Sequence, residues 1–270
     1  MNSQPLQTAA LQPDFQEAER FLNALGGSGA EYTFQTFDDS PEKRKGLAII
    51  RHGSLQTHWP ELVRANRAGA GVFVCVNQTD GKGRKAENVT GIRALYIDLD
   101  GAPLDPVTNP QITPFLPNII VNSGGIGRYH CYWIIDNCPI EQFTHFQKQL
   151  ISRFRADPTI HDLPRVMRIP GFYHCKADPV LVTIKSLRYG SIPCPSFAES
   201  FGLSLAPPPQ EIPVYTPKAA LSPDSDPALL VKVRKLALTA AAWTLAEGGC
   251  GRHNAVVKAC LLYTSPSPRD

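Results

Sequence analysis

Apolar positions along the chain follow two spacings, one typical of helices and one typical of strands. Asp14–Leu25 and Ile140–Phe154 carry apolar side chains every three to four residues, which predicts two amphipathic helices. Tyr32–Phe37 alternates between apolar and polar residues, as a strand does. Val72–Val76 and Leu95–Leu99 are short apolar runs, and such runs predict buried strands.

Weaker signals predict three more elements. Leu47–Ile50 and Val180–Ile184 have the composition of strands. Pro60 is favourable at the first position of a helix, so it predicts a helix over residues 61–67. Because the strands are interrupted by only a few helices, the pattern favours an α+β fold with a mixed, largely antiparallel sheet.

A glycine-rich turn separates two apolar segments in the middle of the chain. Ile119–Val121 is β-branched, Ser123–Gly127 contains three glycines, and Tyr129–Ile135 is aromatic and apolar, which predicts a hairpin. Residues two apart on a strand share a face, so Arg128 and His130 lie on the same side. A single histidine in a strand is most often a hydrogen-bonded core residue, so His130 gains meaning only from its neighbours.

Two carboxylates follow another buried strand. The segment Arg93–Gly101 ends in Asp98 and Asp100, whose i, i+2 spacing projects both side chains from one face. Crowded carboxylates repel each other, and a hard divalent cation relieves that repulsion while gaining oxygen ligands. The same short pattern also fits a strand end that is capped by solvated acids in a turn.

The segment Asp157–Lys176 is rich in side chains that bind phosphate. Its three prolines prevent a regular helix and predict a rigid, irregular loop. Guanidinium and ammonium groups beside a carboxylate-held metal suit a triphosphate, whose charge needs several cations. A surface run of charges is the alternative interpretation. The candidate phosphate-binding side chains of this loop follow the carboxylate of Asp162, and they are Arg165, Arg168, His174 and Lys176.

These motifs, in this order, resemble those of the archaeo-eukaryotic primase superfamily, and most closely the RepB-like primase–polymerase domains of plasmid and phage replication proteins. Asp98 and Asp100 match the first motif of the superfamily, His130 the second and Asp162 the third. The likeness extends from about Tyr32 to Ser186.

The resemblance implies a fold with an RRM-like catalytic unit and an N-terminal αβ unit. It implies template-directed nucleotidyl transfer that makes or extends primers, with two Mg²⁺ or Mn²⁺ ions held by Asp98, Asp100 and Asp162. It also implies a single-stranded DNA template, nucleoside triphosphates and a replicative helicase as partners. The expected catalytic residues are Asp98, Asp100, His130 and Asp162, and the expected nucleotide-binding residues are Arg128, His130, Arg165, Arg168, His174 and Lys176.

The chain departs from the superfamily pattern at two places. Arg128 occupies a position where a small residue is usual, and Ile160 and His161 precede the third acid where a plainer apolar residue is common. Neither departure removes an expected metal ligand.

Two other classes of protein share parts of the pattern. Asp98–Gly101 also resembles the opening of a haloacid-dehalogenase-like phosphatase, but that family has Thr or Val after the glycine, where this chain has Ala102. A non-catalytic, origin-binding replication protein would keep the fold without the activity, because a fold alone does not establish function.

Composition narrows the setting. The chain has 270 residues, 43% of them hydrophobic and 19% charged, with a net charge of +3 that permits a nucleic-acid partner. Two basic clusters, Lys43–Lys45 and Lys82–Lys85, suit either a template backbone or solvated loop tips. Seven cysteines without a CxxC pair favour a reducing compartment. No apolar run reaches about 18 residues, so we expect no membrane partner and a cytoplasmic location.

Proline content divides the chain. Residues 1–205 are expected to form the primase–polymerase catalytic domain, and residues 206–227 a Pro-rich linker. Residues 228–260 have a helical pattern and resemble the start of a helical domain, which we expect to be truncated. Residues 261–270 resemble translated adapter sequence, so we expect a non-native tail.

Overall fold

The computed structural model describes residues 11–206, within the first of the two units into which the chain divides. The predicted linker, helical segment and tail, from residue 207 on, lie outside the described residues. No helix between residues 11 and 206 is long and apolar enough to cross a membrane.

One sheet is built mainly from the N-terminal part of the chain. Its strand order is β2 (Ile50–Gly53), β1 (Tyr32–Asp38), β3 (Ala70–Cys75) and β9 (Val166–Arg168), and every pair is antiparallel. Helix α2 (Leu55–Arg67) packs on this sheet. Strand β9 comes from the loop segment predicted to bind phosphate, so that segment joins the N-terminal sheet.

The second sheet carries the paired acids. Its order is β12 (Thr183–Leu187), β7 (Ile119–Asn122), β8 (Arg128–Asp136) and then β6 (Ala94–Asp100), with every pair antiparallel. The short strand β13 (Ile192–Pro193) runs parallel to the end of β8. The predicted mixed, largely antiparallel α+β architecture is therefore confirmed, and the doubly wound parallel sheet that a haloacid-dehalogenase phosphatase requires is absent from residues 11–206.

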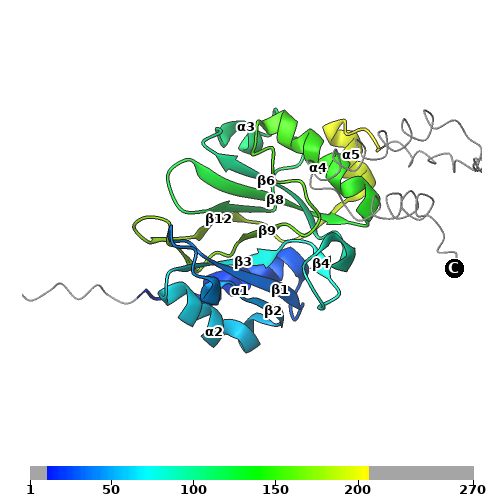
Figure 1. The fold of residues 1–270 in the computed structure, drawn as a ribbon. Helices are drawn as coiled ribbons and strands as arrows, with labels where there is room; N and C mark the ends of the chain where they lie inside the picture. The colour runs from blue at the N-terminus through cyan, green and yellow to red at the C-terminus, as the bar shows by residue number, and fades with distance from the viewer. Residues whose placement is uncertain (1–10, 207–270) are drawn as a thin grey trace, which may run out of the picture. The chain divides into compact units, whose positions relative to one another are not determined.

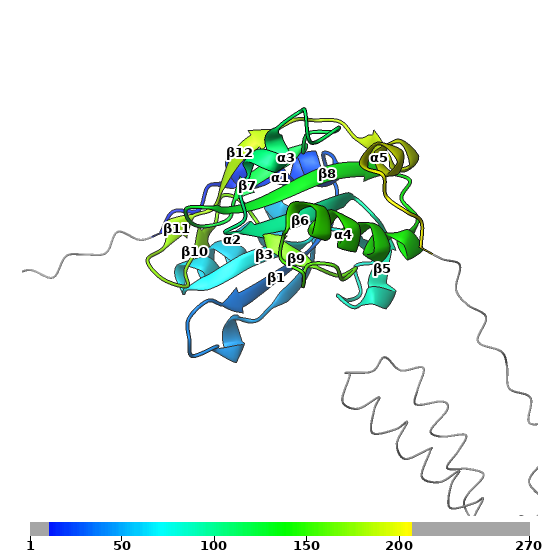
Figure 2. The ribbon, with the colours of Figure 1, turned by 90° about the horizontal axis from the view of Figure 1, so that it is seen from above.

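Helices cover the outer faces of the two sheets. Figure 1 shows the sheets one above the other, with α4 (Ile140–Phe154) and α5 (Cys194–Phe201) over the sheet that contains β6 and β8 and with α2 below the other sheet. The view from above shows α4 running beside β6 (Figure 2). Trp133 of β8 anchors the α4–α5 layer, because its ring packs against Phe154, Phe197 and Phe201.

Helix α1 (Phe15–Gly26) ties the two halves together. Phe15 packs edge-on against Trp59 of α2, and Phe21 packs against Tyr132 of β8. The Glu17 carboxylate accepts a 2.7 Å hydrogen bond from the backbone N–H of Ile184 in β12. The helix thus fixes both sheets to each other.

Smaller elements complete the described part of the chain. They are α3 (Asp105–Thr108), the strand pairs β4 (Gln78–Thr79) with β5 (Val89–Gly91) and β10 (Tyr173–His174) with β11 (Val180–Leu181), and 3-10 turns over Lys45–Leu47 and Ala86–Asn88.

Two sequence predictions about element boundaries are wrong. Helix α2 begins at Leu55, because the Ser54 hydroxyl accepts the N–H of Thr57 at 3.2 Å and caps the helix; Pro60 lies inside it. The strand expected at Leu47–Ile50 begins only at Ile50, after the 3-10 turn. In contrast, the predicted helices at residues 14–25 and 140–154 agree with α1 and α4.

The free edge of β6 is covered by side-chain and loop hydrogen bonds. Gln147 of α4 is fully buried; its amide oxygen accepts the N–H of Tyr96 at 3.2 Å, and its amide nitrogen donates to the Tyr96 and Ile160 carbonyls. The backbone N–H of Asp157 donates to the Asp98 carbonyl at 2.9 Å. The loop after α4 therefore lies along β6 at the level of the paired acids.

We predict that Gln147→Leu destabilises the domain by about 2–4 kcal/mol, because it leaves buried backbone groups of β6 without partners. Urea denaturation measures the loss. Lys148→Leu, on the exposed side of the same helix, is the control and should change stability by no more than about 0.5 kcal/mol. Equal effects of the two substitutions would contradict this account of the edge.

Candidate active site

The pairing of β6 with β8 sets the site. Asp98 lies directly opposite His130, and Asp100 lies directly opposite Arg128. All four side chains belong to one face of the sheet. The alternation along the sequence predicts this within each pair, and the register of β6 with β8 brings the two pairs together. The Asp98 carboxylate is 3.8 Å from His130 Nε2, and the Asp100 carboxylate is 3.2 Å from Arg128 Nε.

Asp98 is a partly buried acid with other acids near it. Burial raises its pKa to about 6, with further increases from the charges of Asp157 and Asp100. Arg128 and Arg165 act in the opposite direction. The site thus holds negative charge that the surrounding side chains do not neutralise.

His130 is a neutral imidazole in this environment. Burial lowers its pKa to about 3, and the nearby charges of Arg168 and His174 add to the decrease. Its Nδ1 lies 3.3 Å from the Tyr132 hydroxyl, which orients the ring. The contact of His130 with Asp98 is therefore not an ion pair.

A hollow of about 330 Å³ opens between the two sheets at this point. It has one wall from the sheet of β6 and β8 and the other from the N-terminal sheet and the loop around β9. Its charged and polar lining residues are Asp38, Asp39, Lys43, Asp98, His130, Arg168 and Lys176, and its apolar ones are Phe37, Phe73, Ile160, Val166 and Met167.

Arg168 is held by an acid that sequence reasoning did not identify. Its two terminal nitrogens donate to the Asp39 carboxylate at 2.9 and 2.7 Å, and its guanidinium lies 4.6 Å above the Phe73 ring. Burial acts to raise the pKa of Asp39, but the hydrogen bonds and charge of Arg168 prevail and lower it. Gly71 makes room for this arrangement, since a Cβ there would lie 2.2 Å from the guanidinium. The signal available in the sequence was the acid that directly follows the strand Tyr32–Asp38.

His174 lies behind the hollow and is buried. Its Nδ1–H donates to the Ser123 carbonyl at 3.2 Å, and its Nε2 has no partner among the described residues. Burial and the charge of Arg168 lower its pKa. Gly124 has a φ of +123°, and a Cβ there would lie 2.2 Å from the His174 ring, so the turn requires glycine at this position.

The structure does not bring Asp162 to the paired acids. Asp162 accepts a 2.5 Å hydrogen bond from Arg165 Nε, and Arg165 also donates to the Thr159 carbonyl, so the two residues brace the loop. The acid whose charge acts most strongly on Asp98 is Asp157. Within residues 11–206, no three His, Cys, Asp or Glu side chains converge to hold one metal ion. The predicted group Asp98, Asp100 and Asp162 is therefore not assembled in this structure.

The two basic clusters, Lys43–Lys45 and Lys82–Lys85, contain side chains that bind other parts of the protein. Arg44 forms a bidentate ion pair with Asp38 at 2.7 and 3.0 Å. Arg84 donates to Gln35 and to the Pro164 carbonyl. Lys43 lines the hollow, which connects the first cluster to the site.

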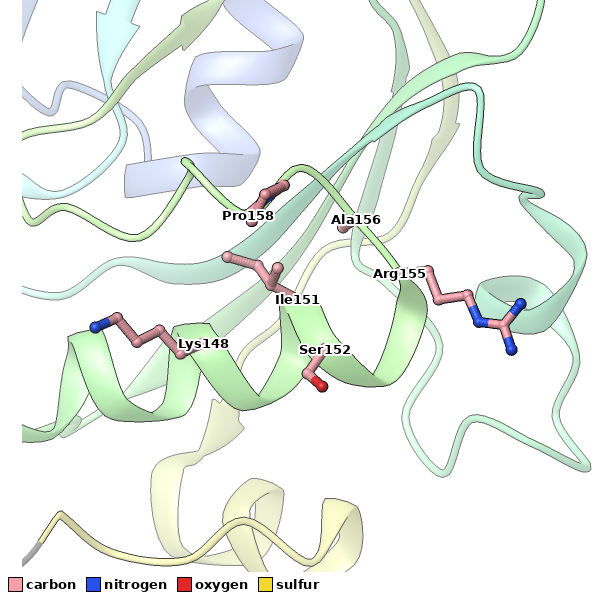
Figure 3. Close-up of a pocket in the computed structure, with 6 residues that line it drawn as sticks. All are labelled: Lys148, Ile151, Ser152, Arg155, Ala156 and Pro158. Carbon is pink, nitrogen blue, oxygen red and sulfur yellow. The ribbon is translucent and has the colours of Figure 1, made fainter.

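A second hollow lies away from the paired acids. It measures about 450 Å³ and lies at the C-terminal end of α4. Figure 3 shows Lys148 and Arg155 pointing away from each other, with Ile151 and Pro158 between them. Its lining contains no acid and no histidine, in contrast to the lining of the hollow between the sheets.

The fold is that of archaeo-eukaryotic primase domains. The primase–polymerase domain of cyanophage S-2L is 18% identical, with a TM-score of 0.57 over 70% of this chain and 98% of that one. The primase RepB′ is 18% identical, with a TM-score of 0.54 over 69% of this chain and 61% of that one. The catalytic domain of RepB′, solved with initiator DNA, is 17% identical, with a TM-score of 0.53 over 69% of this chain and 92% of that one.

Within this class, residues 60–187 match the family described as the RepB DNA-primase N-terminal domain. This segment, slightly less than half of the chain, therefore resembles a RepB-like primase domain. A replication protein of Clostridium perfringens is 26% identical over 163 residues, or 52% of this chain and 39% of that protein. The chain thus spans about two fifths of the length of this curated relative.

The raised pKa of Asp98 gives a prediction about stability. An unfolded chain has this carboxyl near its ordinary pKa of 3.8, against about 6 in the folded state, so the folded state binds more protons between those values. The contribution of Asp98 to the free energy of unfolding must then fall as pH rises through this range and stay low above it.

Asp98→Asn removes that penalty. In EDTA the variant should exceed the wild type in stability by up to about 3 kcal/mol at pH 8, and the difference should vanish near about pH 4. Urea denaturation across pH measures both. Asp178→Asn, at an exposed acid, is the control and should show no such pH-dependent difference in stability. If Asp98→Asn behaved like this control, the proposed penalty for ionising Asp98 in the folded state would be contradicted.

The buried pair Asp39–Arg168 gives a second prediction. Arg168→Met leaves a buried carboxylate without its partner and should destabilise the domain by about 3–5 kcal/mol. The double variant Asp39→Asn with Arg168→Met should recover much of that loss, as a double-mutant cycle would show. Arg51→Met breaks the more exposed pair with Glu61 and should cost about 1 kcal/mol or less. Additive effects of the two substitutions at the buried pair would show that the pair does not act as a unit.

Proposed function

We propose that this domain catalyses template-directed nucleotidyl transfer, making or extending primers on single-stranded DNA in plasmid or phage replication. The observation that carries the proposal is the placement of Asp98 and Asp100 on one face of β6, at the edge of a hollow whose opposite wall supplies cations. Crowded carboxylates facing ammonium and guanidinium groups suit a reaction at a metal-bound triphosphate.

The donor set fits hard divalent cations. Asp98 and Asp100 offer carboxylate oxygens, which are the ligands that Mg²⁺ and Mn²⁺ prefer. The raised pKa of Asp98 indicates negative charge that a cation would neutralise. Two such ions, when bound, would lower the pKa of the attacking primer hydroxyl and balance the charge of the triphosphate and leaving pyrophosphate.

The third carboxylate is Asp157 in our proposal, in place of Asp162. Asp157 is fixed beside Asp98 by a backbone hydrogen bond, and its charge acts on Asp98 more strongly than that of Asp100. Asp162 is engaged by Arg165, whereas Asp157 uses one carboxylate oxygen, Oδ1, to accept hydrogen bonds from the N–H and hydroxyl of Thr159 at 2.8 Å. Asp157 does not converge with the paired acids as a metal-binding group in the described residues either, so this assignment requires its side chain to move toward them.

The nucleotide would bind between the sheets with its phosphates toward the cations. Lys43 and Lys176 line the hollow, and the Asp39-paired guanidinium of Arg168 keeps its Nε free of that carboxylate. Neutral His130 stands between the paired acids and these cations and would orient a phosphate by hydrogen bonding. We keep Arg165 and His174 as nucleotide-binding candidates that act from just outside the hollow.

The DNA partner is supported by a neighbour of known structure. The catalytic domain of RepB′ was solved with initiator DNA, and its fold covers 69% of this chain. Single-stranded DNA is therefore the template we propose. The predicted helicase partner stays a prediction, since nothing in residues 11–206 tests it.

An extension assay tests the proposal. The full chain, a primed single-stranded DNA template, labelled nucleotides and Mn²⁺ or Mg²⁺ should give template-dependent products. Asp100→Ala should abolish them while leaving the domain folded, as cooperative unfolding would confirm. DNA binding without synthesis by the wild type would favour the alternative, a non-catalytic origin-binding replication protein.

Asparagine substitutions separate the two candidates for the third acid. Asp157→Asn should lower the extension rate by about 100-fold or more, since it weakens ion binding at the reacting groups. Asp162→Asn should lower the rate by no more than about tenfold, because it alters loop geometry only. Rates measured at saturating nucleotide and metal decide between them, and the reverse ranking would restore Asp162 as the third ligand.

A further inference from the structure

Arg128 forms an ion pair with an acid that the proposed function requires for metal binding. Its Nε lies 3.2 Å from the Asp100 carboxylate, directly across the two strands. The side chains are 46% and 59% exposed, so both are largely in water. Exposed ion pairs of this kind contribute little to stability and are easily exchanged for a stronger partner.

A divalent cation at Asp98 and Asp100 would be such a partner. It carries twice the charge of a guanidinium and would interact with two carboxylates at once. Arg128 and the ion cannot both occupy the position next to Asp100 without strong like-charge repulsion. The guanidinium must therefore leave Asp100 when the ion binds.

The position of Arg128 indicates where its guanidinium then goes. Asp98 and His130 line the hollow between the sheets, whereas Asp100 and Arg128 lie one pair further along the strands and outside its lining. Arg128 also begins β8 directly after the turn Ser123–Gly127, whose tip is the fully exposed Ile126. The triphosphate has Lys43 and Lys176 inside the hollow, so a released Arg128 faces the outside of the site, where the primer strand must approach.

We propose that Arg128 is an exchangeable counter-ion: it pairs with Asp100 when no metal is bound and transfers to a backbone phosphate of the primer strand when metal binds. This inference rests on the proposed function. The sequence predicted that Arg128 binds the incoming nucleotide. This inference assigns it to the nucleic acid instead. Metal and primer binding would then be coupled, because each favours the released position of the same side chain.

A measurement of metal binding tests the first part of the proposal, in which Arg128 pairs with Asp100 and competes with the metal ion. Mn²⁺ titrated into the metal-free full chain and followed by the electron paramagnetic resonance of free Mn²⁺ should give a Kd about three- to tenfold lower for Arg128→Ala than for the wild type. Arg128→Lys should stay close to the wild type. Arg20→Ala is the matched control, because Arg20 forms an exposed ion pair of the same length with Glu17 on α1; it should leave the Kd unchanged.

DNA binding tests the second half. With Ca²⁺ present to prevent turnover, Arg128→Ala should bind a primer–template several-fold more weakly than the wild type. Its slope of log affinity against log salt should be smaller by about one. In EDTA, Asp100→Asn should bind DNA more tightly than the wild type, because its Arg128 has no carboxylate partner. The double variant, Asp100→Asn with Arg128→Ala, should lose this gain in DNA affinity. The nucleotide KM of Arg128→Ala should change by less than about twofold.

The outcomes separate this inference from the proposed function. If Mn²⁺ and DNA bind but Arg128→Ala changes neither affinity, the exchange is overturned and the proposed function stands. A large rise in nucleotide KM with unchanged DNA affinity would also overturn it and return Arg128 to the nucleotide. If the wild-type chain binds neither Mn²⁺ nor DNA, the proposed function itself fails.

Discussion

The two sheets of this domain face each other across a charged hollow, and the buried ion pair between Asp39 and Arg168 fixes the wall that the N-terminal sheet contributes. The pair joins residues 129 positions apart: one follows β1, and the other ends β9. The same carboxylate accepts the N–H of Cys175, which fixes the start of the loop that leads to Lys176. Burying two charges costs desolvation free energy, and the bidentate geometry with a third hydrogen bond offsets that cost.

The opposite wall of the hollow, formed by the sheet of β6 and β8, carries negative charge. Strand β6 ends with acids that are not matched by equal positive charge, and the loop after α4 adds Asp157 beside them. Gln147 and the Asp157 N–H occupy the free edge of β6 and fix the backbone that carries the acids. Repulsion between such acids is typical of sites that are completed by a cation.

The sequence was sufficient for the features that depend on local pattern. Alternation placed Asp98 with Asp100 on one face of a strand and Arg128 with His130 on one face of another. The strand register then brings the two pairs together. The helix of residues 140–154 follows from its apolar spacing alone. The start of α2 was missed because a capping serine outweighed the proline signal.

What the sequence could not supply were contacts between distant segments. The partner of Arg168 is 129 residues away, and no local pattern marks Asp39 as buried. The choice between Asp157 and Asp162 depends on a backbone hydrogen bond to β6 that exists only once α4 has packed. Motif order suggested the later acid, whereas the tertiary contact favours the earlier one.

The charges that remain unpaired define what the hollow can hold. Asp38 is neutralised by Arg44 and Asp39 by Arg168, and His130 carries no charge. Lys43 and Lys176 are then the lining cations without a carboxylate partner among the described residues, and Asp98 is the lining acid without one. The two lysines alone cannot balance a triphosphate, so its charge requires the cations that the carboxylates on β6 would recruit. In the proposed function, the hollow would therefore accept a nucleotide that arrives with metal. Its lining supplies too little positive charge to retain the nucleotide by itself and too much negative charge at Asp98 to accept it without an ion.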